Sequence, residues 1–392
     1  GTVDWDTTPK TATFTAVSGD GFFCNTTGGV FTCNLPAGSS GAIVSLADYA
    51  GTWQTNNLTV SPNGSDKIGG TNSSLTLNTE GQSVTFVFVD STQGWVNVQD
   101  STSNERPPAF VTATGGTITT VCTNFKVHTF TGPGTFCVSC AGNAAGSDTV
   151  DYLVIAGGGG AAIDNGGGGG AGGFRESCGG ASGCYSTSPL ANSCGALPVT
   201  AQGYPITVGG GGASPPCTNI AVSGNPSIFS TITSTGGGGS GGDDNFASLP
   251  GGSGGGGGGR YGPVNPTGGA GNGNTPPVSP PQGRNGGIGG APGNTGAGGG
   301  GGASAVGTPG QSQPSNNGGN GADGVATSIT ASSVTRAGGG GGGSGQSAGA
   351  GGTGGAGGGG DADTSPGSVA GSPGTTNTGG GGGGGCQSGS GG

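Results

Sequence analysis

The segment Val150–Gly160 reads VDYLVIAGGGG, and at Gly157 this 392-residue chain changes character. Up to Ala156 the segment is rich in the β-branched and aromatic residues that strands favour. From Gly157 onward pure glycine runs recur, and most of the 106 glycines lie there. Glycine has no side chain to bury and loses more backbone freedom on folding than any other residue. The glycine-rich part is therefore either disordered or ordered by hydrogen bonds between backbones.

The glycine runs favour an ordered bundle. Collagen needs glycine at every third position without pure runs, and a flexible linker needs neither repeated runs nor strand-like segments such as Pro205–Val208 and Ser227–Thr233. The strand that ends at Ala156 also enters the first run directly. We expect extended threefold helices of the polyglycine type II kind, in which each N–H meets a carbonyl of a neighbouring helix and the connecting loops gather at the two ends.

The first 156 residues contain short runs of β-branched and aromatic residues separated by Pro, Gly, Asn and Asp. Turn sequences such as Pro62–Gly64 and Asp90–Gly94 commonly join antiparallel strands. No segment shows a helical period, so we expect a mainly β fold with almost no α-helix. Because the chain stops within a repeat at Gly392, we expect the glycine-rich part to be incomplete there. We expect three parts: an antiparallel β-sandwich-like module at 1–105, a small β connector module at 106–156 and the polyglycine II bundle with surface loops at 157–392.

The charge balance excludes some partners. The formal net charge is −10, with only 8 Lys and Arg residues and no basic cluster, which argues against a nucleic-acid partner. No stretch approaches ~20 consecutive apolar residues, so we expect no membrane insertion.

Ten cysteines in a chain rich in Ser, Thr and Asn suggest an oxidising exterior with local disulfides. Cys24 and Cys33 flank a turn sequence and could bridge a hairpin, whereas spacing leaves the other pairings open. Metal binding is disfavoured, because a single CxxC and the lone His128 do not supply a ligand set, and we expect no cofactor. The disulfide candidates are Cys24, Cys33, Cys122, Cys137, Cys140, Cys178, Cys184, Cys194 and Cys217.

Catalytic patterns are weak. No glycine run is followed by the Lys-Ser/Thr of a phosphate loop, and His128 lies in an alternating strand without a nucleophile elbow nearby. The acidic pairs Asp243–Asp244 and Asp361/Asp363 lack the aromatic walls of a glycosidase site. Solvated loop charges are the favoured interpretation, with calcium ligands as an alternative. We therefore expect a protein that is not an enzyme.

Exposed aromatic and arginine side chains carry much of the binding energy at recognition surfaces, and a glycine bundle has little core for them to fill. Phe174 and Tyr204 have an alternative role as structural caps of the bundle. Trp53 and Trp95 are better explained by core or trimer-interface packing. The receptor-binding candidates are Phe174, Arg175, Tyr185, Tyr204, Phe246, Arg260 and Tyr261.

Several segments resemble bacteriophage tail-fibre and adhesin proteins, many of them from marine and cyanobacterial phages. Val150–Gly160, followed by Gly166–Arg175 and preceded by Phe130–Phe136, is similar to their glycine-rich domain, and Ala47–Val60 with Val89–Trp95 looks like a β module common in phage tail fibres. The chain lacks the apolar strand that often closes such proteins after the last glycine run.

The resemblance implies a virion appendage outside the cell, with β modules that assemble as a homotrimer together with other tail-fibre or virion subunits. It also implies a tip whose loops bind a bacterial surface receptor, either an outer-membrane protein or a polysaccharide. Two other functions stay open: a structural fibre subunit that recognises no receptor, and a polysaccharide depolymerase.

Overall fold

The computed structural model describes residues 3–101, 109–142, 146–179, 183–193, 195–214, 220–242, 247–259, 268–291, 295–345, 349–363 and 371–385. These residues form strands, turns and extended segments without an α-helix, so the expected mainly β fold is confirmed. The chain forms two compact units, Gly1–Pro107 and Pro108–Gly392.

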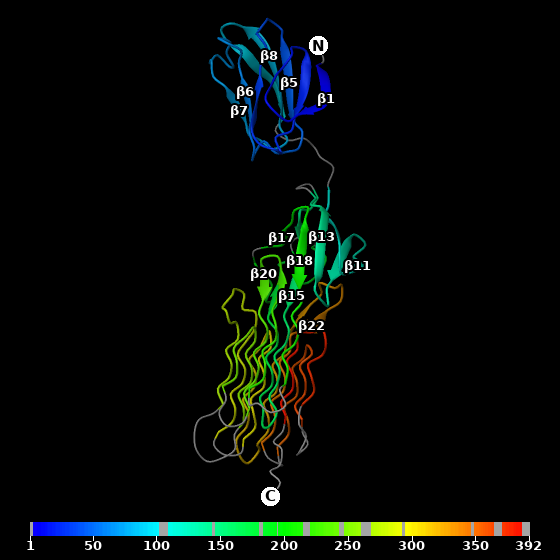
Figure 1. Ribbon diagram of the computed structural model, residues 1–392, viewed down its shortest axis with the longest axis vertical. Helices are drawn as coiled ribbons and strands as arrows, with labels where there is room; N and C mark the ends of the chain where they lie inside the picture. The colour runs from blue at the N-terminus through cyan, green and yellow to red at the C-terminus, as the bar shows by residue number, and fades with distance from the viewer. Residues whose placement is uncertain are drawn as a thin grey trace. The chain divides into compact units, whose positions relative to one another are not determined.

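The first unit is a sandwich of two sheets (Figure 1). One sheet has the strand order β1-β3-β5-β8-β9, with β1 (Asp4–Lys10), β3 (Asp20–Cys24), β5 (Ile43–Asp48), β8 (Ser83–Asp90) and β9 (Gly94–Ser101). The other has the order β2-β4-β6-β7, with β2 (Phe14–Thr15), β4 (Phe31–Asn34), β6 (Leu58–Ser61) and β7 (Leu75–Leu77).

Both sheets are mixed, whereas we expected antiparallel strands. The first six strands alternate between the sheets, so the chain crosses the sandwich and returns before it adds the next strand to the same sheet. Neighbours reached in this way point in the same direction, and β1–β3, β3–β5, β2–β4 and β4–β6 are all parallel. The remaining pairs, β5–β8, β6–β7 and β8–β9, are antiparallel.

The core of the first unit lies between the sheets, because alternate side chains of a strand point to opposite faces. Trp53 and Trp95 are fully buried there, as core packing requires. Cys24 and Cys33 are also buried and free. They lie on β3 and β4, which belong to opposite sheets rather than to one hairpin. The hairpin disulfide that we considered is therefore absent.

The second unit begins with an antiparallel sheet of order β10-β13-β18-β19-β20. Its strands are β10 (Thr112–Thr114), β13 (Gly134–Cys140), β18 (Gly203–Thr207), β19 (Ser227–Phe229) and β20 (Ile232–Ser234). Four strand pairs surround it: β11 (Thr117–Val121) with β12 (Phe125–Thr129), β14 (Thr149–Val150) with β17 (Leu197–Pro198), β15 (Leu153–Ile155) with β16 (Phe174–Glu176), and β21 (Val325–Thr327) with β22 (Val334–Arg336). Because β13 pairs with β18, the segment 109–156 shares its sheet with strands that follow Gly157.

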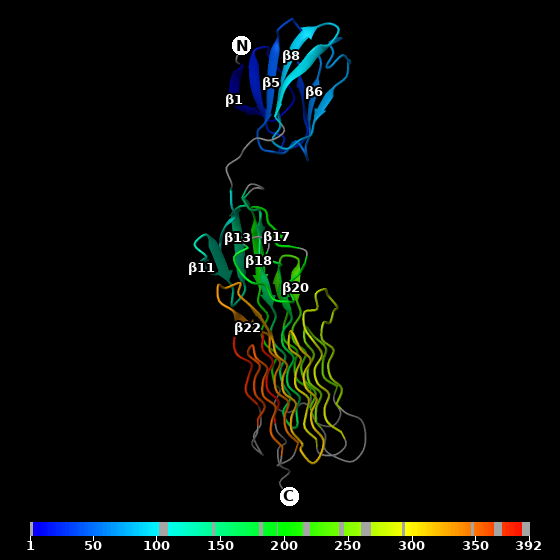
Figure 2. The ribbon, with the colours of Figure 1, turned by 180° about the vertical axis from the view of Figure 1, so that it is seen from behind.

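From Gly157 the chain runs back and forth in extended segments that lie side by side in both views (Figures 1 and 2). The segment 166–173 is at the centre. Its successive N–H groups donate in turn to residues 379–385, 235–241 and 298–301, so the direction of donation repeats every third residue. Its carbonyls accept from residues 340–343, 253–256 and 156–159. Six described segments therefore surround it, as in the hexagonal packing of polyglycine II.

Many interior positions of the bundle leave no space for a side chain. A Cβ built on Gly168 would lie 2.0 Å from the carbonyl oxygen of Gly340, and one built on Gly169 would lie 2.1 Å from that of Gly159. The N–H of Gly168 donates to Gly298 at 3.0 Å, and its carbonyl accepts from Gly256 at 2.8 Å. Satisfied backbone groups thus take the place of a side-chain core.

The outer segments carry one larger residue in three. In the segment 317–323 the non-glycine residues Asn317, Asn320 and Asp323 lie at the surface, while Gly319 and Ala322 are buried. The neighbouring segment repeats this pattern at Ala350, Thr353 and Ala356, all exposed. A threefold helix presents every third residue on the same side, so these residues form outward rows.

The bundle joins the β strands through a small core and a disulfide. Phe174 is 1% exposed and packs with Val325 and Ala337. The buried carboxylate of Glu176 accepts hydrogen bonds from Ser188 N at 2.9 Å and from Thr327 Oγ1. Cys122, in the turn between β11 and β12, is bonded to Cys184.

Candidate functional site

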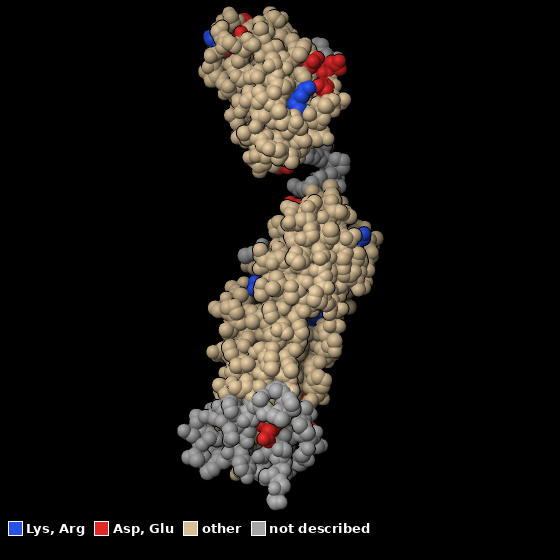
Figure 3. Space-filling view, viewed as in Figure 1, with Lys and Arg blue, Asp and Glu red and all other residues tan. Residues whose placement is uncertain are grey.

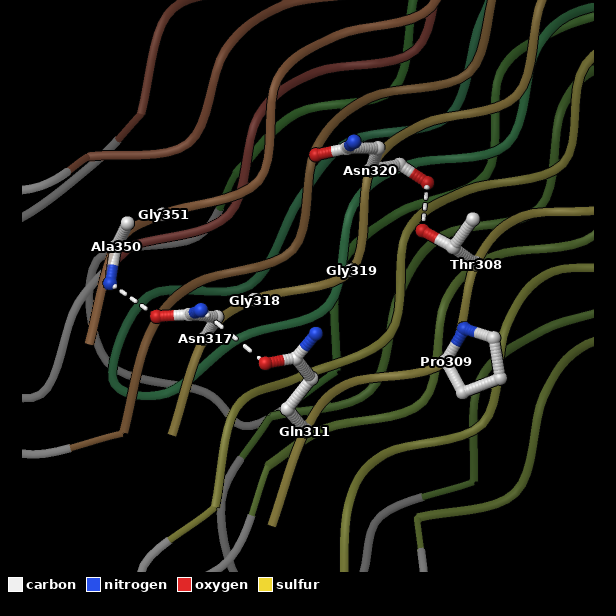
Figure 4. Close-up of a pocket in the computed structure, with 9 residues that line it drawn as sticks. All are labelled: Thr308, Pro309, Gln311, Asn317, Gly318, Gly319, Asn320, Ala350 and Gly351. Atoms are coloured by element: carbon white, nitrogen blue, oxygen red, sulfur yellow. Dashed lines mark hydrogen bonds between the residues drawn. The ribbon is translucent and has the colours of Figure 1, made fainter. Parts of the chain in front are cut away.

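A shallow groove runs along the flank of the bundle. It has a volume of about 320 Å³ and lies between three outer segments, 308–311, 317–320 and 350–351 (Figure 4). Its lining residues are Thr308, Pro309, Gln311, Asn317, Gly318, Gly319, Asn320, Ala350 and Gly351.

Backbone pairing fixes the three walls of the groove. Thr308 N donates to Asn320 O at 3.0 Å and Gln311 N donates to Asn317 O at 2.8 Å, which ties the first wall to the second. Gly318 N donates to Ala350 O at 2.9 Å, which ties the second wall to the third. The groove is therefore as rigid as the bundle that carries it.

A ladder of side chains reinforces the second and third walls. Asn317 Oδ1 accepts from Ala350 N at 2.8 Å, and one turn further along Asn320 Oδ1 accepts from Thr353 N at 3.0 Å. Asp323 Oδ1 continues the ladder with Ala356 N at 2.8 Å. Each of these side-chain oxygens accepts from a backbone N–H for which the described chain offers no backbone acceptor.

The groove offers hydrogen-bonding groups of no net charge. Asn317 Nδ2 donates to Gln311 Oε1 at 3.1 Å. Within the described part of the chain, the Nδ2 group of Asn320 and the Nε2 group of Gln311 have no hydrogen-bond partner, and Pro309 adds an apolar ring. The view in Figure 3 shows only scattered Lys and Arg side chains on this unit. Such a surface suits a hydroxyl-rich or amide-rich neutral ligand better than a polyanion.

The groove opens beside the end of the bundle that is remote from the strands, which we call the distal end. Asn165, Gly259, Thr295, Gly345 and Gly385 mark this end. Gly259 N donates to Asn165 O at 2.8 Å, and Gly166 N donates to Gly385 O at 3.2 Å. Gln311 O accepts from Gly296 N at 2.9 Å, which places the groove next to this end. The described chain stops and resumes near this end at five places: Gly242/Ala247, Gly259/Gly268, Ala291/Thr295, Gly345/Gly349 and Asp363/Gly371.

Two of the predicted receptor-binding aromatics are core residues. Phe174, 1% exposed, lies on β16 opposite Ile155, and Tyr204, 7% exposed, lies on β18 opposite Phe136. The hydroxyl of Tyr204 accepts from Thr200 N at 2.8 Å. Their burial leaves little of either ring for a receptor to contact. Both rings are buried because the glycine region contains strands with small cores of their own.

The remaining candidates are half-buried or lie outside the description. Arg175 is half-buried on β16. Tyr185 is half-buried too, with its hydroxyl 3.2 Å from Ser177 Oγ, and burial raises the pKa of its phenol. Three candidates lie outside the described residues: Phe246, Arg260 and Tyr261.

The cluster around Ser177 holds the chain in place. Ser177 Oγ accepts from Tyr152 N at 3.1 Å and donates to Asp151 Oδ1 at 2.8 Å. His128, the only histidine, is in a different place, where its Nδ1 is 2.8 Å from Gly115 O and its ring packs against Phe136. It thus has the structural environment that we expected of a strand histidine.

The remaining cysteine and acidic candidates do not form a common site among the described residues. Beyond the bridged pair, Cys137, Cys140 and Cys178 are free, and Cys194 and Cys217 lie outside the described residues. Asp361 Oδ1 accepts from Gly354 N at 2.7 Å, while Asp243 and Asp244 fall outside the description. Among the described residues, no three His, Cys, Asp or Glu side chains gather as metal ligands. Nor does any described helix have the length and apolar character needed to cross a membrane.

The groove was missed because its residues are neither aromatic nor charged. A signal for it exists in the sequence: Asn317-Gly-Gly-Asn320-Gly-Ala-Asp323 places a hydrogen-bonding side chain at every third position, as an outer threefold helix requires.

Comparison with known families agrees with the fold. A family model described as a glycine-rich domain matches residues 130–392, and the chain belongs to this family. No curated protein matches the chain.

Proposed function

We propose that this member of the glycine-rich domain family is an extracellular adhesin, carried on a virion tail fibre, that binds a bacterial surface receptor through the distal end of its bundle. The observation that carries the proposal is that the residues that hold the bundle together are different from those at its surface. Hydrogen bonds between glycine backbones hold the bundle, so surface side chains such as those of Gln311 and Thr353 are available for recognition.

The chemistry of the groove indicates the class of receptor. Amide groups such as those of Gln311 and Asn320 suit the hydroxyl and amide groups of a neutral surface polysaccharide or an outer-membrane protein loop. The virion location and assembly as a homotrimer with other tail-fibre subunits rest on the sequence resemblance described above. Placement on a trimeric fibre would also make binding multivalent, which strengthens weak individual contacts.

A second candidate is a structural fibre subunit in which the bundle serves only as a spacer. The rigidity of the backbone-held bundle favours it equally well, whereas the open amide groups beside the distal end favour the adhesin. A depolymerase is the third possibility, and the cluster around Ser177 does not support it, because that oxygen binds a backbone N–H and has no histidine beside it.

Adsorption of the labelled full chain to a panel of candidate host bacteria tests the proposal. One variant replaces residues 260–267 with a Gly/Ser segment of equal length, and a second is Gln311→Ala in the groove. The matched control replaces residues 329–333, the turn between β21 and β22 away from the distal end.

We expect strain-selective adsorption that the distal replacement abolishes, that Gln311→Ala weakens and that the control retains. Adsorption by none of the proteins to any strain would favour the spacer. Release of reducing sugar from host polysaccharide would favour the depolymerase.

A further inference from the structure

The second unit displays two free cysteines on one open face of its five-stranded sheet. Cys137 and Cys140 are both exposed and both lie on β13. In a regular strand, residues three apart point to opposite faces. A second feature of β13 is needed to bring these two together.

A β-bulge supplies that feature. Val138 pairs with Ala113 of β10 and Cys140 pairs with Thr112, so Ser139 is an extra residue on β13. The bulge shifts the alternation by one, which places Cys140 on the same face as Cys137. The burial pattern agrees, since Phe136 and Val138 are buried while Cys137, Ser139 and Cys140 are exposed.

The surroundings leave both thiols accessible. On the far side of β13, Cys137 lies opposite Gly203, which has no side chain to cover it. On the near side Thr114 and Thr112 pair with Cys137 and Cys140, and both threonines are exposed. Ser139 Oγ is occupied, because it donates to Thr112 O at 3.1 Å.

The spacing suits a bridging metal better than a disulfide. Cys137 pairs with Thr114 and Cys140 with Thr112. These two threonines are two residues apart on β10, which corresponds to about 6.6 Å along the strand. The two cysteine side chains leave the sheet side by side, whereas a disulfide requires Cβ atoms within about 4.5 Å and sulfurs about 2.0 Å apart. A metal between two sulfurs, each about 2.3 Å from it, spans up to about 4.6 Å.

We propose that Cys137 and Cys140 form a binding site for one thiophilic metal ion. Each thiol releases its proton to solvent and donates a sulfur lone pair, so two S–H bonds are replaced by two S–metal bonds and no electron is transferred. Thiolates select soft ions of the Cu(I) class and related d¹⁰ ions, and two-coordinate binding needs no further protein ligand.

Titration of the full chain with Cd²⁺, followed by the ultraviolet absorbance of S–Cd bonds, tests the site. The variants are Cys137→Ser and Cys140→Ser, both at exposed positions. The matched control is Cys178→Ser, which removes another free cysteine outside the sheet.

We expect one Cd²⁺ site in the full chain that each of the two variants weakens by about a hundredfold, because chelation is lost, while Cys178→Ser retains it. Phenylarsine oxide, which bridges two thiols, should compete with Cd²⁺ for the site. Unchanged Cd²⁺ binding in Cys137→Ser would overturn the proposal. So would peptide mapping that finds the two cysteines joined as a disulfide in the protein isolated without oxidant.

Discussion

Replacement of one central glycine by alanine should unfold the bundle locally. Gly168 lies in the segment that six others surround, and the Cβ of Gly168→Ala would be 2.0 Å from Gly340 O and 2.5 Å from its carbonyl carbon. Ordinary contact begins near 3.4 Å, so the segment that contains Gly340 would have to move by more than an ångström. It cannot do so independently, because Gly340 N donates to Gly169 O at 3.0 Å and Gly300 N donates to Gly340 O at 2.8 Å.

The expected cost follows from those contacts. Overpacking a close-packed interior costs about 1–3 kcal/mol, and each buried backbone group left without a partner costs about 1–3 kcal/mol more. One lost hydrogen bond leaves two groups without partners, so Gly168→Ala should lower the free energy of unfolding by about 3–9 kcal/mol. The matched control is Gly269→Ala in the same bundle, where a Cβ meets nothing within 4 Å. Because alanine also restricts the unfolded chain, the control should be neutral or stabilising by up to about 1 kcal/mol.

Calorimetry and amide hydrogen exchange of peptides from the bundle would measure both variants. We expect Gly168→Ala to lower the unfolding temperature and to speed exchange across the segments around it, whereas Gly269→Ala should match the parent protein. Equal stability of the two variants would refute the reasoning, because it would mean that the bundle is held loosely enough to admit side chains anywhere.

Three further predictions concern other parts of the molecule. Burial raises the pKa of Cys33 to about 12 from 9.0, so the folded state keeps a proton that the unfolded chain releases. The stability that this thiol contributes below pH 9 should fall by about 1.4 kcal/mol per pH unit from pH 9 to 12, and Cys24, whose pKa burial also raises, adds to the loss. Urea unfolding followed by tryptophan fluorescence measures the stability of the first unit, since all three tryptophans lie there. Cys33→Ala should lose less stability at alkaline pH than the parent protein. Asn320→Ala should speed amide exchange at Thr353 and cost about 1 kcal/mol, while Asn320→Asp keeps the acceptor and should not; equal exchange in both would contradict the ladder. Cys122→Ser removes the disulfide to Cys184, which closes a loop of 62 residues, and should destabilise the second unit by about 4 kcal/mol. An unchanged unfolding temperature in calorimetry would show that the disulfide contributes no stability.

The sequence predicted the kind of fold because its composition is so biased. Pure glycine runs such as Gly254–Gly259 leave backbone hydrogen bonding as the main source of order, and the structure uses them as interior helices. The outer helices were harder to see, because segments such as 317–323 contain no pure run and their period of three is short. Strand direction in the first unit could not be predicted either, since it depends on which sheet each strand joins.

The residues of the candidate site were also hard to predict from the sequence. Phe174 and Tyr204 looked like recognition residues because a glycine bundle offers no core, yet each packs in a small core where strands meet the bundle. Which aromatic residues are buried depends on the pairings of β15–β16 and β13–β18, which join residues far apart in sequence. The groove formed by Thr308, Asn320 and Ala350 depends in turn on three segments becoming neighbours, and no local pattern specifies that.

A fold held by backbone hydrogen bonds divides its positions into two classes. A Cβ at Gly168 would collide with a neighbouring carbonyl, whereas the side chains of Thr353 and Ala356 are exposed although their backbones bond to the neighbouring segment. In a fold with a side-chain core, a new binding surface often disturbs packing, because surface and core residues lie on the same strands. Here an outward side chain that makes no hydrogen bond within the described residues, such as that of Thr353 or Ala356, can change without altering a packed layer. The same bundle can therefore carry many different surfaces at little cost in stability, which is the property that the proposed receptor-binding role requires.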